Sequence, residues 1–357
     1  MVPKSDPMAL VPLIAQATAH IGIVATMTTS FTPPYTAARL GATLDHLSDG
    51  RFGFNIVTAH NDRSAQNFGL DRHYDHDLRY EMADEWMEVV GKLWNSWEDG
   101  AIVRDAEGGV FADVSKVRTI DHDGRFYKCR GPLNTVPGPQ RHPVICQAGG
   151  SPAGRGFAAR HSDTILARFR KVDEARAFRD DIRARMKEAG RNPDDCKVLY
   201  MMTAIVDESD ALAQARKRHL AERTAADFEH KLAFMSYASG KDFSRFDLDA
   251  PVPEITTNAA QASTKALTGG YGAKTLREIA SDPGSGGFDF VGTADSVAAQ
   301  MGEVAAAIGG DGFLISHPLN RRTVAEIADG LAPALKRRGL LRDRYTGATL
   351  RENLTAC

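Results

Sequence analysis

The segment Gln147–Arg155 (QAGGSPAGR) combines residue types that can hold a phosphate group. The apolar run Pro143–Ala148 predicts a buried strand, and the glycines after it allow the backbone to approach an oxyanion closely. A helix that begins near Ser151 would add free N–H groups, the positive end of a helix dipole and a hydroxyl. An ordinary strand-to-helix turn with Ser151 as its N-cap would have the same sequence, so both interpretations stay open.

Two other groups of polar side chains follow predicted strands. Asn55 and Thr58, with His60 and Asn61 close behind, end one strand, and the stretch Thr26–Ser30 (TMTTS) ends another. Such side chains can bind the polar edge of a ring, or they can satisfy the backbone of their own turns. The residue types alone favour neither interpretation.

Acidic and histidine residues gather at Asp71–Tyr80 (DRHYDHDLRY). Histidine and aspartate side chains bind metal ions, so a metal-dependent barrel hydrolase is one hypothesis. Their spacing does not match HExxH, and no later group is clearly placed to complete a site, so we expect no metal. The sequence also has no GxSxG elbow, P-loop or dinucleotide-binding GxGxxG in the required context.

The elements that must position these groups are predicted from the apolar pattern. Short apolar runs, most of them continuous as in strands buried on both faces, predict six strands at Ile21–Thr26, Phe52–Thr58, Pro143–Ala148, Thr164–Arg168, Val198–Val206 and Gly312–Ser316. Amphipathic segments predict helices at Pro7–His20, Pro34–Leu47, Leu78–Trp97, Asp173–Ala189 and Asp295–Ile308. This alternation indicates an α/β fold with a parallel sheet, of the TIM-type (β/α)8 barrel kind. In such barrels functional side chains lie at the carboxyl ends of the strands.

We expect one domain over residues 1–357, with two insertions. Residues 101–142 are predicted to be irregular, with a hairpin over Arg118–Arg130 that turns at Asp123 and Gly124. Residues 228–288 are polar and weakly periodic, and are predicted to form a mobile lid over the barrel mouth. Because six strands are fewer than a closed barrel requires, we expect the first β-α-β unit to be missing.

Charge and cysteine content narrow the function classes. With 44 basic and 46 acidic residues, no overall field attracts nucleic acid or an acidic membrane. The apolar stretch Met8–Thr26 is interrupted by polar residues and a proline, and is predicted to be a helix and a strand, not a signal peptide. The four cysteines are widely spaced, which favours a reducing cytoplasm: Cys129, Cys146, Cys196 and Cys357.

The same segments resemble the luciferase-like flavin-dependent monooxygenases, in the branch of nitrilotriacetate monooxygenase component A and dibenzothiophene-sulfone monooxygenase. The matching stretches are Leu44–Thr58 (LDHLSDGRFGFNIVT), Gln66–Asp71 (QNFGLD), His76–Glu98 (beginning HDLRYEMADEW), Phe111–Asn134 (beginning FADVSKVRT), Gln147–Asp163 (QAGGSPAGRGFAARHSD) and Lys336–Leu354 (KRRGLLRDRYTGATLRENL). The resemblance implies a TIM-type barrel that binds reduced FMN. It also implies that the reduced FMN reacts with O₂ to form a flavin C4a-peroxide, and that this peroxide oxygenates a small organic substrate.

By position, the resemblance implies that Ser151 and its turn hold the FMN phosphate. Thr58, and less securely Thr26, would contact the isoalloxazine. His76 and Tyr80 match a family HDxRY pattern that binds FMN, which reinterprets the apparent metal cluster. Asn55 is a weaker candidate beside them, and no catalytic residue is assigned.

Two departures from the family pattern accompany this assignment. The turn has Gly-Gly-Ser where relatives have Gly-Ser-Ser, and the missing β-α-β unit ends, in relatives, in an aspartate that helps to bind flavin. The alternatives are hydride transfer through a deazaflavin or flavin on the same fold, or an inactive truncated remnant. Expected partners are a separate NAD(P)H:flavin reductase that supplies FMNH₂, a small-molecule substrate and further copies in a homo-oligomer.

Overall fold

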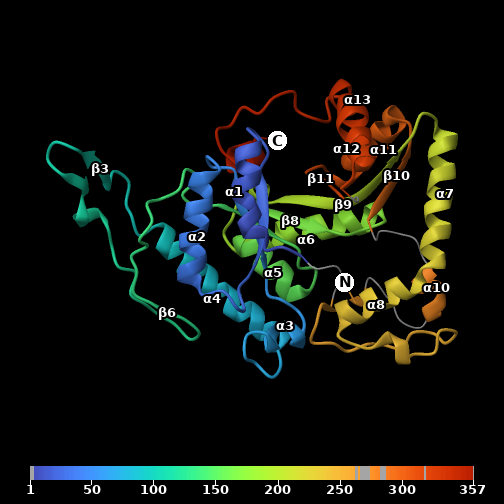
Figure 1. Cartoon of the computed structure of the whole chain (residues 1–357), viewed down its shortest axis with the longest axis horizontal. Helices are drawn as coiled ribbons and strands as arrows, with labels where there is room; N and C mark the ends of the chain where they lie inside the picture. The colour runs from blue at the N-terminus through green and yellow to red at the C-terminus, as the bar shows by residue number, and fades with distance from the viewer. Residues whose placement is uncertain (1–3, 262–263, 266–273, 282–286, 317–318, 357) are drawn as a thin grey trace.

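The computed structural model describes residues 4–261, 264–265, 274–281, 287–316 and 319–356, and its centre is a parallel sheet (Figure 1). The strand order is β1-β2-β7-β8-β9-β10, and β11 also pairs with β9. These strands are β1 (Ile23–Thr28), β2 (Phe52–Val57), β7 (Val144–Gln147), β8 (Thr164–Ala167), β9 (Lys197–Val206), β10 (Phe288–Gly292) and β11 (Gly312–Ile315). The parallel sheet and its helices confirm the predicted TIM-barrel type of fold.

Helices follow most of these strands, as the alternation predicts. The longer ones are α1 (Pro7–Ala17), α2 (Pro34–Leu47), α4 (His76–Trp94), α5 (Pro152–His161), α6 (Val172–Glu188), α7 (Asp210–Ala226), α8 (Phe228–Ser239) and α11 (Ala294–Ile308). The shorter ones are α3 (Asp62–Gln66), α10 (Leu276–Ser281), α12 (Arg321–Ala325), α13 (Ala332–Arg337) and α14 (Leu350–Thr355). The five predicted helices are all present, with ends displaced by at most three residues. Among the described residues, none of these helices combines the length and apolar character that a membrane span requires.

Two strand predictions need correction. The expected first strand, Ile21–Thr26, is displaced by two residues, because β1 pairs with β2 as far as Thr28 opposite Val57. Thr26 therefore lies within the strand and not at its end. The strand β10 was not predicted, because its alternating FDFVG sequence follows a polar stretch that had been assigned to an insertion. The described sheet thus has seven strands, one more than the six predicted.

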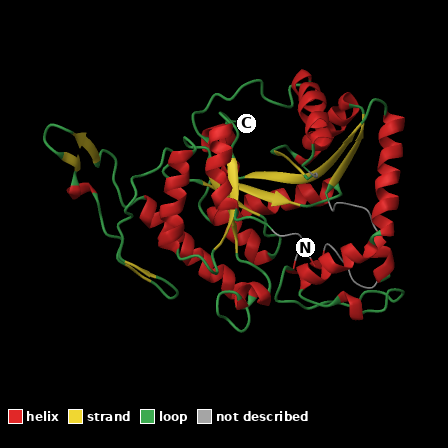
Figure 2. Ribbon diagram, in the orientation of Figure 1, coloured by secondary structure: helices red, strands yellow, loops and turns green. Residues whose placement is uncertain are grey.

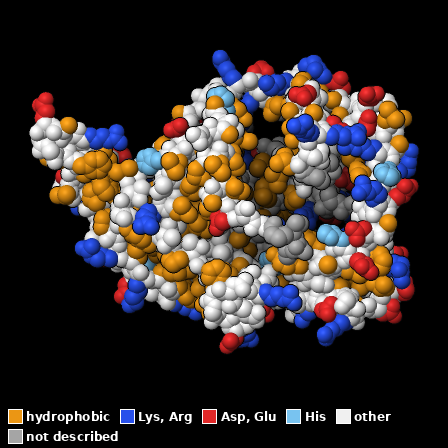
Figure 3. All heavy atoms as spheres, viewed as in Figure 1, with side chains coloured by type: hydrophobic (Ala, Val, Ile, Leu, Met, Phe, Trp, Pro, Cys, Tyr) orange, Lys and Arg blue, Asp and Glu red, His pale blue; other side chains and the backbone are white. Residues whose placement is uncertain are grey.

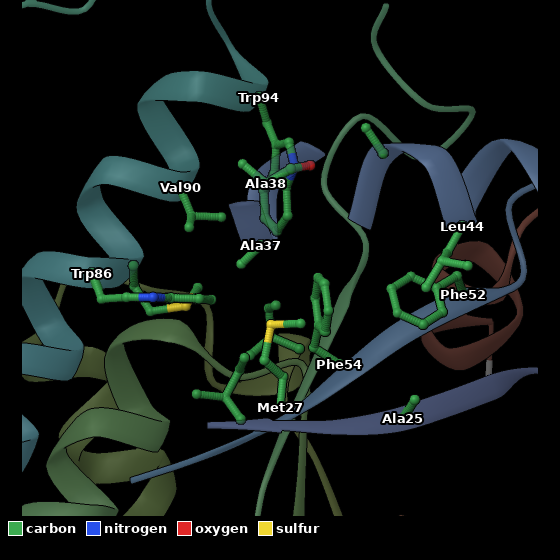
Figure 4. Close-up of a cluster of buried hydrophobic side chains, with 14 of the residues drawn as sticks. Ala25, Met27, Ala37, Ala38, Leu44, Phe52, Phe54, Trp86, Val90 and Trp94 are labelled. Carbon is green, nitrogen blue, oxygen red and sulfur yellow. The ribbon is translucent and has the colours of Figure 1, made fainter. Parts of the chain in front are cut away.

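Two apolar clusters lie between the sheet and its helices. The first joins β1 and β2 to α1, α2 and α4, and includes Phe52, Phe54 and Trp86, which are fully buried. Figure 4 shows Phe52 and Phe54 pointing from β2 toward α2 and α4. The second cluster joins β8, β9 and β10 to α6, α11 and α13. Side chains on the opposite face of the sheet, which we call the open face, include Val24 at 44% exposure.

The predicted insertion at residues 101–142 is an arm that extends from the sheet (Figures 1 and 2). It carries two short antiparallel pairs: β3 (Ile102–Asp105) with β4 (Val110–Ala112), and β5 (His122–Asp123) with β6 (Lys128–Cys129). The second pair confirms the predicted hairpin, but Asp123 is paired with Lys128, so the turn runs from Gly124 to Tyr127 and not over Asp123 and Gly124. The first pair was not predicted.

The region 228–288 contains helices and an apolar cluster that its weakly periodic sequence did not predict. Its described part contains α8 and α10, and a small apolar cluster that includes Met235, Phe243, Val252 and Leu276. Parts of the predicted lid, residues 262–263, 266–273 and 282–286, lie outside the described residues. Because the apolar residues come from short segments far apart in the sequence, no single segment shows a strong period.

Candidate functional site

The hydroxyl of Tyr80 is the point at which three of the predicted site residues meet. Tyr80 lies in the first half of α4, and its hydroxyl lies beside the side chains of Ser151, Gln147 and Thr58. Burial raises the pKa of the Tyr80 phenol, and these three polar side chains together with the charge of Arg79 oppose that shift. The phenol is therefore protonated at neutral pH. It ties the ends of β2 and β7 to α4.

The glycine turn after β7 packs directly against this hydroxyl. A Cβ atom added to Gly154 would lie 2.8 Å from the Tyr80 oxygen and 2.9 Å from the Cα of Gly149. A Cβ atom added to Gly149 would lie 2.9 Å from the same oxygen. Only glycine at both positions lets the turn, the helix start and the phenol come this close.

The structure shows one of the two roles that the sequence left open to Ser151. It is the N-cap of α5: its Oγ accepts a hydrogen bond from the backbone N–H of Gly154 at 3.2 Å. Pro152 follows at the first helical position, and the Ser151 side chain is 7% exposed. Within the described part of the chain, the backbone N–H groups of Gly150 and Ser151 have no acceptor. The turn therefore presents two N–H donors and the positive end of a ten-residue helix, which together favour an anion.

His76 begins α4 one turn before Tyr80, and the two ring centroids lie 5.3 Å apart. Its Nδ1 atom is 2.7 Å from a carboxylate oxygen of Asp77, and its side chain is 12% exposed. Its backbone N–H donates to Oδ1 of Asn258 at 2.7 Å. His76 thus lies between the Tyr80 cluster and the segment that was predicted to form a lid.

Asn258 fastens that segment to the start of α4. Its Nδ2 donates to the backbone carbonyl of Tyr74 at 3.0 Å, and its own carbonyl accepts from the guanidinium of Arg79. The Arg79 guanidinium, 1% exposed, also donates to the carbonyl of Ala59 at 2.7 Å. Ala59 has a φ of 52°, a conformation that favours glycine, so this bond holds the end of β2 in a strained turn.

His73 supports the same turn, and its geometry argues against the metal hypothesis. Its Nδ1 accepts from the backbone N–H of Tyr74 at 2.9 Å, and its Nε2 lies 3.1 Å from the carbonyl of Thr58, which requires an N–H there. Burial lowers the pKa of His73 to about 4. Both nitrogens are used by the fold, so neither has a lone pair for a metal. Among the described residues, no three His, Cys, Asp or Glu side chains form a group that could hold a metal ion.

Thr26 and Asn55 lie apart from the Tyr80 cluster, on the open face of the sheet. They are partners in the β1–β2 register, and Asn55 donates from Nδ2 to Thr26 Oγ1 at 3.0 Å. The other amide atom of Asn55, Oδ1, is buried and has no partner among the described residues. Cys146 and Thr164 continue the same row across β7 and β8. Burial raises the pKa of the Cys146 thiol, so it stays protonated.

Sequence reasoning missed several residues that build this site. Gln147 accepts the N–H of Gly149 at 2.6 Å and also reaches Tyr80. Arg79 was part of the charged cluster but had no assigned role, and Asn258 lies in a polar stretch without a motif. Arg79 is one residue before Tyr80 in the HDLRY pattern, so that pattern was the available signal. Nothing in the sequence near Asn258 indicated its contact.

The chain matches known proteins along most of its length. The family model described as Luciferase-like monooxygenase matches residues 2–312. Dibenzothiophene-sulfone monooxygenase of Rhodococcus erythropolis is 36% identical over 98% of this chain and 79% of its own length. Nitrilotriacetate monooxygenase component A of Aminobacter aminovorans is also 36% identical, over 98% of this chain and 78% of its own. A solved riboflavin lyase with modified FMN and riboflavin is 31% identical, has a TM-score of 0.91, and is matched over 100% of this chain and 79% of that chain.

Proposed function

This chain belongs to the luciferase-like monooxygenase family, and from that premise we propose where it holds its cofactor and how its own residues serve the reaction. The protein is a flavin-dependent monooxygenase that acts on a small organic substrate and uses FMN. The observation that carries the proposal is the meeting of Thr58, Tyr80 and Ser151 at the glycine turn.

The residues at this turn fit the phosphate end of FMN. Gly149 and Gly154 let the turn pack closely on Tyr80, and the N–H groups of Gly150 and Ser151 are available to phosphate oxygens. The Ser151 hydroxyl and the protonated Tyr80 phenol add two further donors. In this proposal the Gly-Gly-Ser turn compensates for its single hydroxyl with backbone donors and with Tyr80.

The ring of FMN would extend from the turn across the end of β2. There Thr58 and His76 would contact it, and the unpaired Oδ1 of Asn55 beside Thr26 offers an acceptor for a ring N–H on the open face. Bound in its reduced form, FMN supplies the electrons with which O₂ is activated for transfer of one oxygen atom to the substrate. Asn258, which fastens its segment over the start of α4, would help to keep water from this position.

The partners follow from the chemistry of reduced FMN. We infer a separate NAD(P)H:flavin reductase as its source, supported by the relative that is named as component A, one part of a larger system. A homo-oligomer and a cytoplasmic location also stay predictions. The cytoplasmic prediction is supported by three cysteines without disulfides: Cys129, Cys146 and Cys196.

Substitution of Ser151 tests the cradle. Ser151→Ala is expected to weaken anaerobic binding of reduced FMN about fivefold, since a lost hydrogen bond to a charged group costs about 1 kcal/mol or more. Reduced riboflavin, which has no phosphate, should bind the variant almost as well as the unchanged protein. Ser209→Ala is the matched control, because Ser209 caps α7 in the same way, accepting from Leu212 at 3.3 Å, away from this site.

Equal losses for FMN and riboflavin would show that Ser151 does not touch the phosphate. Failure of the unchanged protein to bind reduced FMN would contradict the proposed function itself. Reduction of a deazaflavin without oxygen consumption would favour the hydride-transfer alternative.

A further inference from the structure

Arg168 directly follows β8, on the open face of the sheet. Ile165 and Ala167 belong to the buried cluster under the helices. Because side chains alternate along a strand, Thr164, Leu166 and Arg168 lie on the opposite face. The neighbouring strand β7 pairs with β8 and continues, at the same edge, into the glycine turn. Arg168 is therefore at the carboxyl end of the sheet, one strand away from the cradle.

This arginine differs from the other cations of the molecule. Desolvation by the surrounding protein lowers the pKa of two arginines among the described residues, Arg79 and Arg168. The two terminal nitrogens of Arg79 donate to two backbone carbonyls. Arg168 makes no hydrogen bond or ion pair within the described part of the chain, while its side chain stays accessible to solvent.

Two other cations that follow β7 and β8 are paired. Arg155, which follows the glycine turn, is 3.1 Å from Asp181, and Lys171 is 3.2 Å from Glu174. Partial desolvation of a guanidinium without a counter-ion is unfavourable in free energy. An anion that binds to it offsets this unfavourable contribution through charge-assisted hydrogen bonds. Figure 3 shows that the molecule is hollowed between α1 and the α12–α13 region.

We propose that Arg168 binds an anionic group of the substrate, a carboxylate or a sulfonate, and so selects small organic anions for oxygenation. This inference rests on the proposed function, because it assigns the substrate of the same site. The guanidinium is planar and presents paired donors, which match both oxygens of a carboxylate or sulfonate. The phosphate of FMN is the other anion at this edge, and the experiment separates the two.

The test measures binding of chosen probes to the protein saturated with reduced FMN under anaerobic conditions. Succinate and benzenesulfonate are the anionic probes, and succinamide and benzenesulfonamide are their neutral counterparts. Arg168→Gln is expected to weaken the anions by about 10- to 100-fold, the range of a charge-assisted contact, and to leave the neutral probes unchanged. Arg168→Lys should restore part of the binding. Arg170→Gln removes the same charge two residues away and should have little effect.

Three outcomes would overturn the inference in distinguishable ways. If Arg168→Gln weakens FMN but not riboflavin and leaves the probes unchanged, the arginine serves the cofactor phosphate. If the unchanged protein binds reduced FMN but neither anion more tightly than its neutral counterpart, the substrate class is wrong while the proposed function stands. If the unchanged protein does not bind reduced FMN, the proposed function fails, and the inference fails with it.

Discussion

At the scale of single residues, His73 shows how a histidine can serve the site without touching a ligand. It is 3% exposed, and its two ring nitrogens hold the carbonyl of Thr58 and the N–H of Tyr74. Thr58 is thereby fixed at the end of β2, where its side chain reaches Tyr80. This arrangement requires a neutral imidazole with its proton on Nε2.

The neutral state of His73 predicts a pH dependence of stability. Its pKa is about 4 in the folded protein and near 6.5 in the unfolded chain, so the unfolded chain takes up the proton first as the pH falls. Above pH 6.5 the neutral His73 should contribute fully to the free energy of unfolding. As the pH falls from 6.5 to 4, the free energy of unfolding should decrease by up to about 3 kcal/mol. Urea unfolding at pH 7, 6 and 5 measures it.

A His73→Gln variant should lose part of that slope between pH 7 and 5. His219→Gln is the matched control, because the His219 side chain is 68% exposed on α7. Should the slopes of the unchanged protein and His73→Gln coincide, His73 would not be the group that titrates.

At the scale of elements, the start of α5 must be helical and must also pack closely against Tyr80. The first requirement disfavours glycine, and the second requires it at Gly154. A helix is stabilised when alanine replaces an interior glycine, yet α5 keeps Gly154 and Gly156. Only Gly154 has a structural reason, because the Tyr80 oxygen and Gly149 occupy the space of its missing Cβ atom. At Gly156 the added Cβ would meet only the flexible end of Arg160, at 3.3 Å.

The two glycines should therefore respond oppositely to alanine. Gly154→Ala is expected to lower the free energy of unfolding by about 1–3 kcal/mol, since the turn must move to relieve overpacking. Gly156→Ala should leave it unchanged or raise it by up to about 1 kcal/mol. Denaturant titration of both variants measures this pair. A stabilised Gly154→Ala would show that the turn is not packed against Tyr80.

At the scale of the whole molecule, the carboxyl-terminal tail returns to the amino ends of the strands. The backbone N–H of Leu350 donates to the carbonyl of Gly50, just before β2, at 2.8 Å. Arg351 donates to both carboxylate oxygens of Asp163, before β8, at 2.5 and 2.9 Å, and to the carbonyl of His142, before β7, at 3.0 Å. The tail thus joins three strands at the end of the sheet opposite to the cradle.

Removal of the Arg351 side chain should weaken the whole fold. Arg351→Ala is expected to lower the free energy of unfolding by about 2 kcal/mol, because Asp163, with a side chain 14% exposed, would be left without its cation. Arg337→Ala is the matched control: its pair with Asp295 is 60% and 66% exposed and should be worth less than about 1 kcal/mol. Thermal or denaturant unfolding of both variants measures the difference. Equal small losses of unfolding free energy would mean that Arg351 does not stabilise the fold through Asp163.

The sequence alone was sufficient for the features that depend on neighbours along the chain. Apolar runs located six strands, amphipathic spacing located five helices, and Ser151 after a glycine turn predicted both an N-cap and a donor site. Local conformational preference and burial act over a few residues, so they leave a readable pattern. The HDLRY stretch belongs with these features, since His76 and Tyr80 lie one helical turn apart.

Tertiary structure decided what these features do together. Gln147 and Asn258 were assigned no role from the sequence, because their partners lie on other elements. Asn258 and His76, for example, are 182 residues apart in the chain. The unpaired state of Arg168 likewise depends on which acids the fold brings near, and no spacing along the chain encodes that. Contacts between distant segments are set by packing of the complete molecule, so the sequence named the flavin-binding candidates, and the fold determined which of them meet.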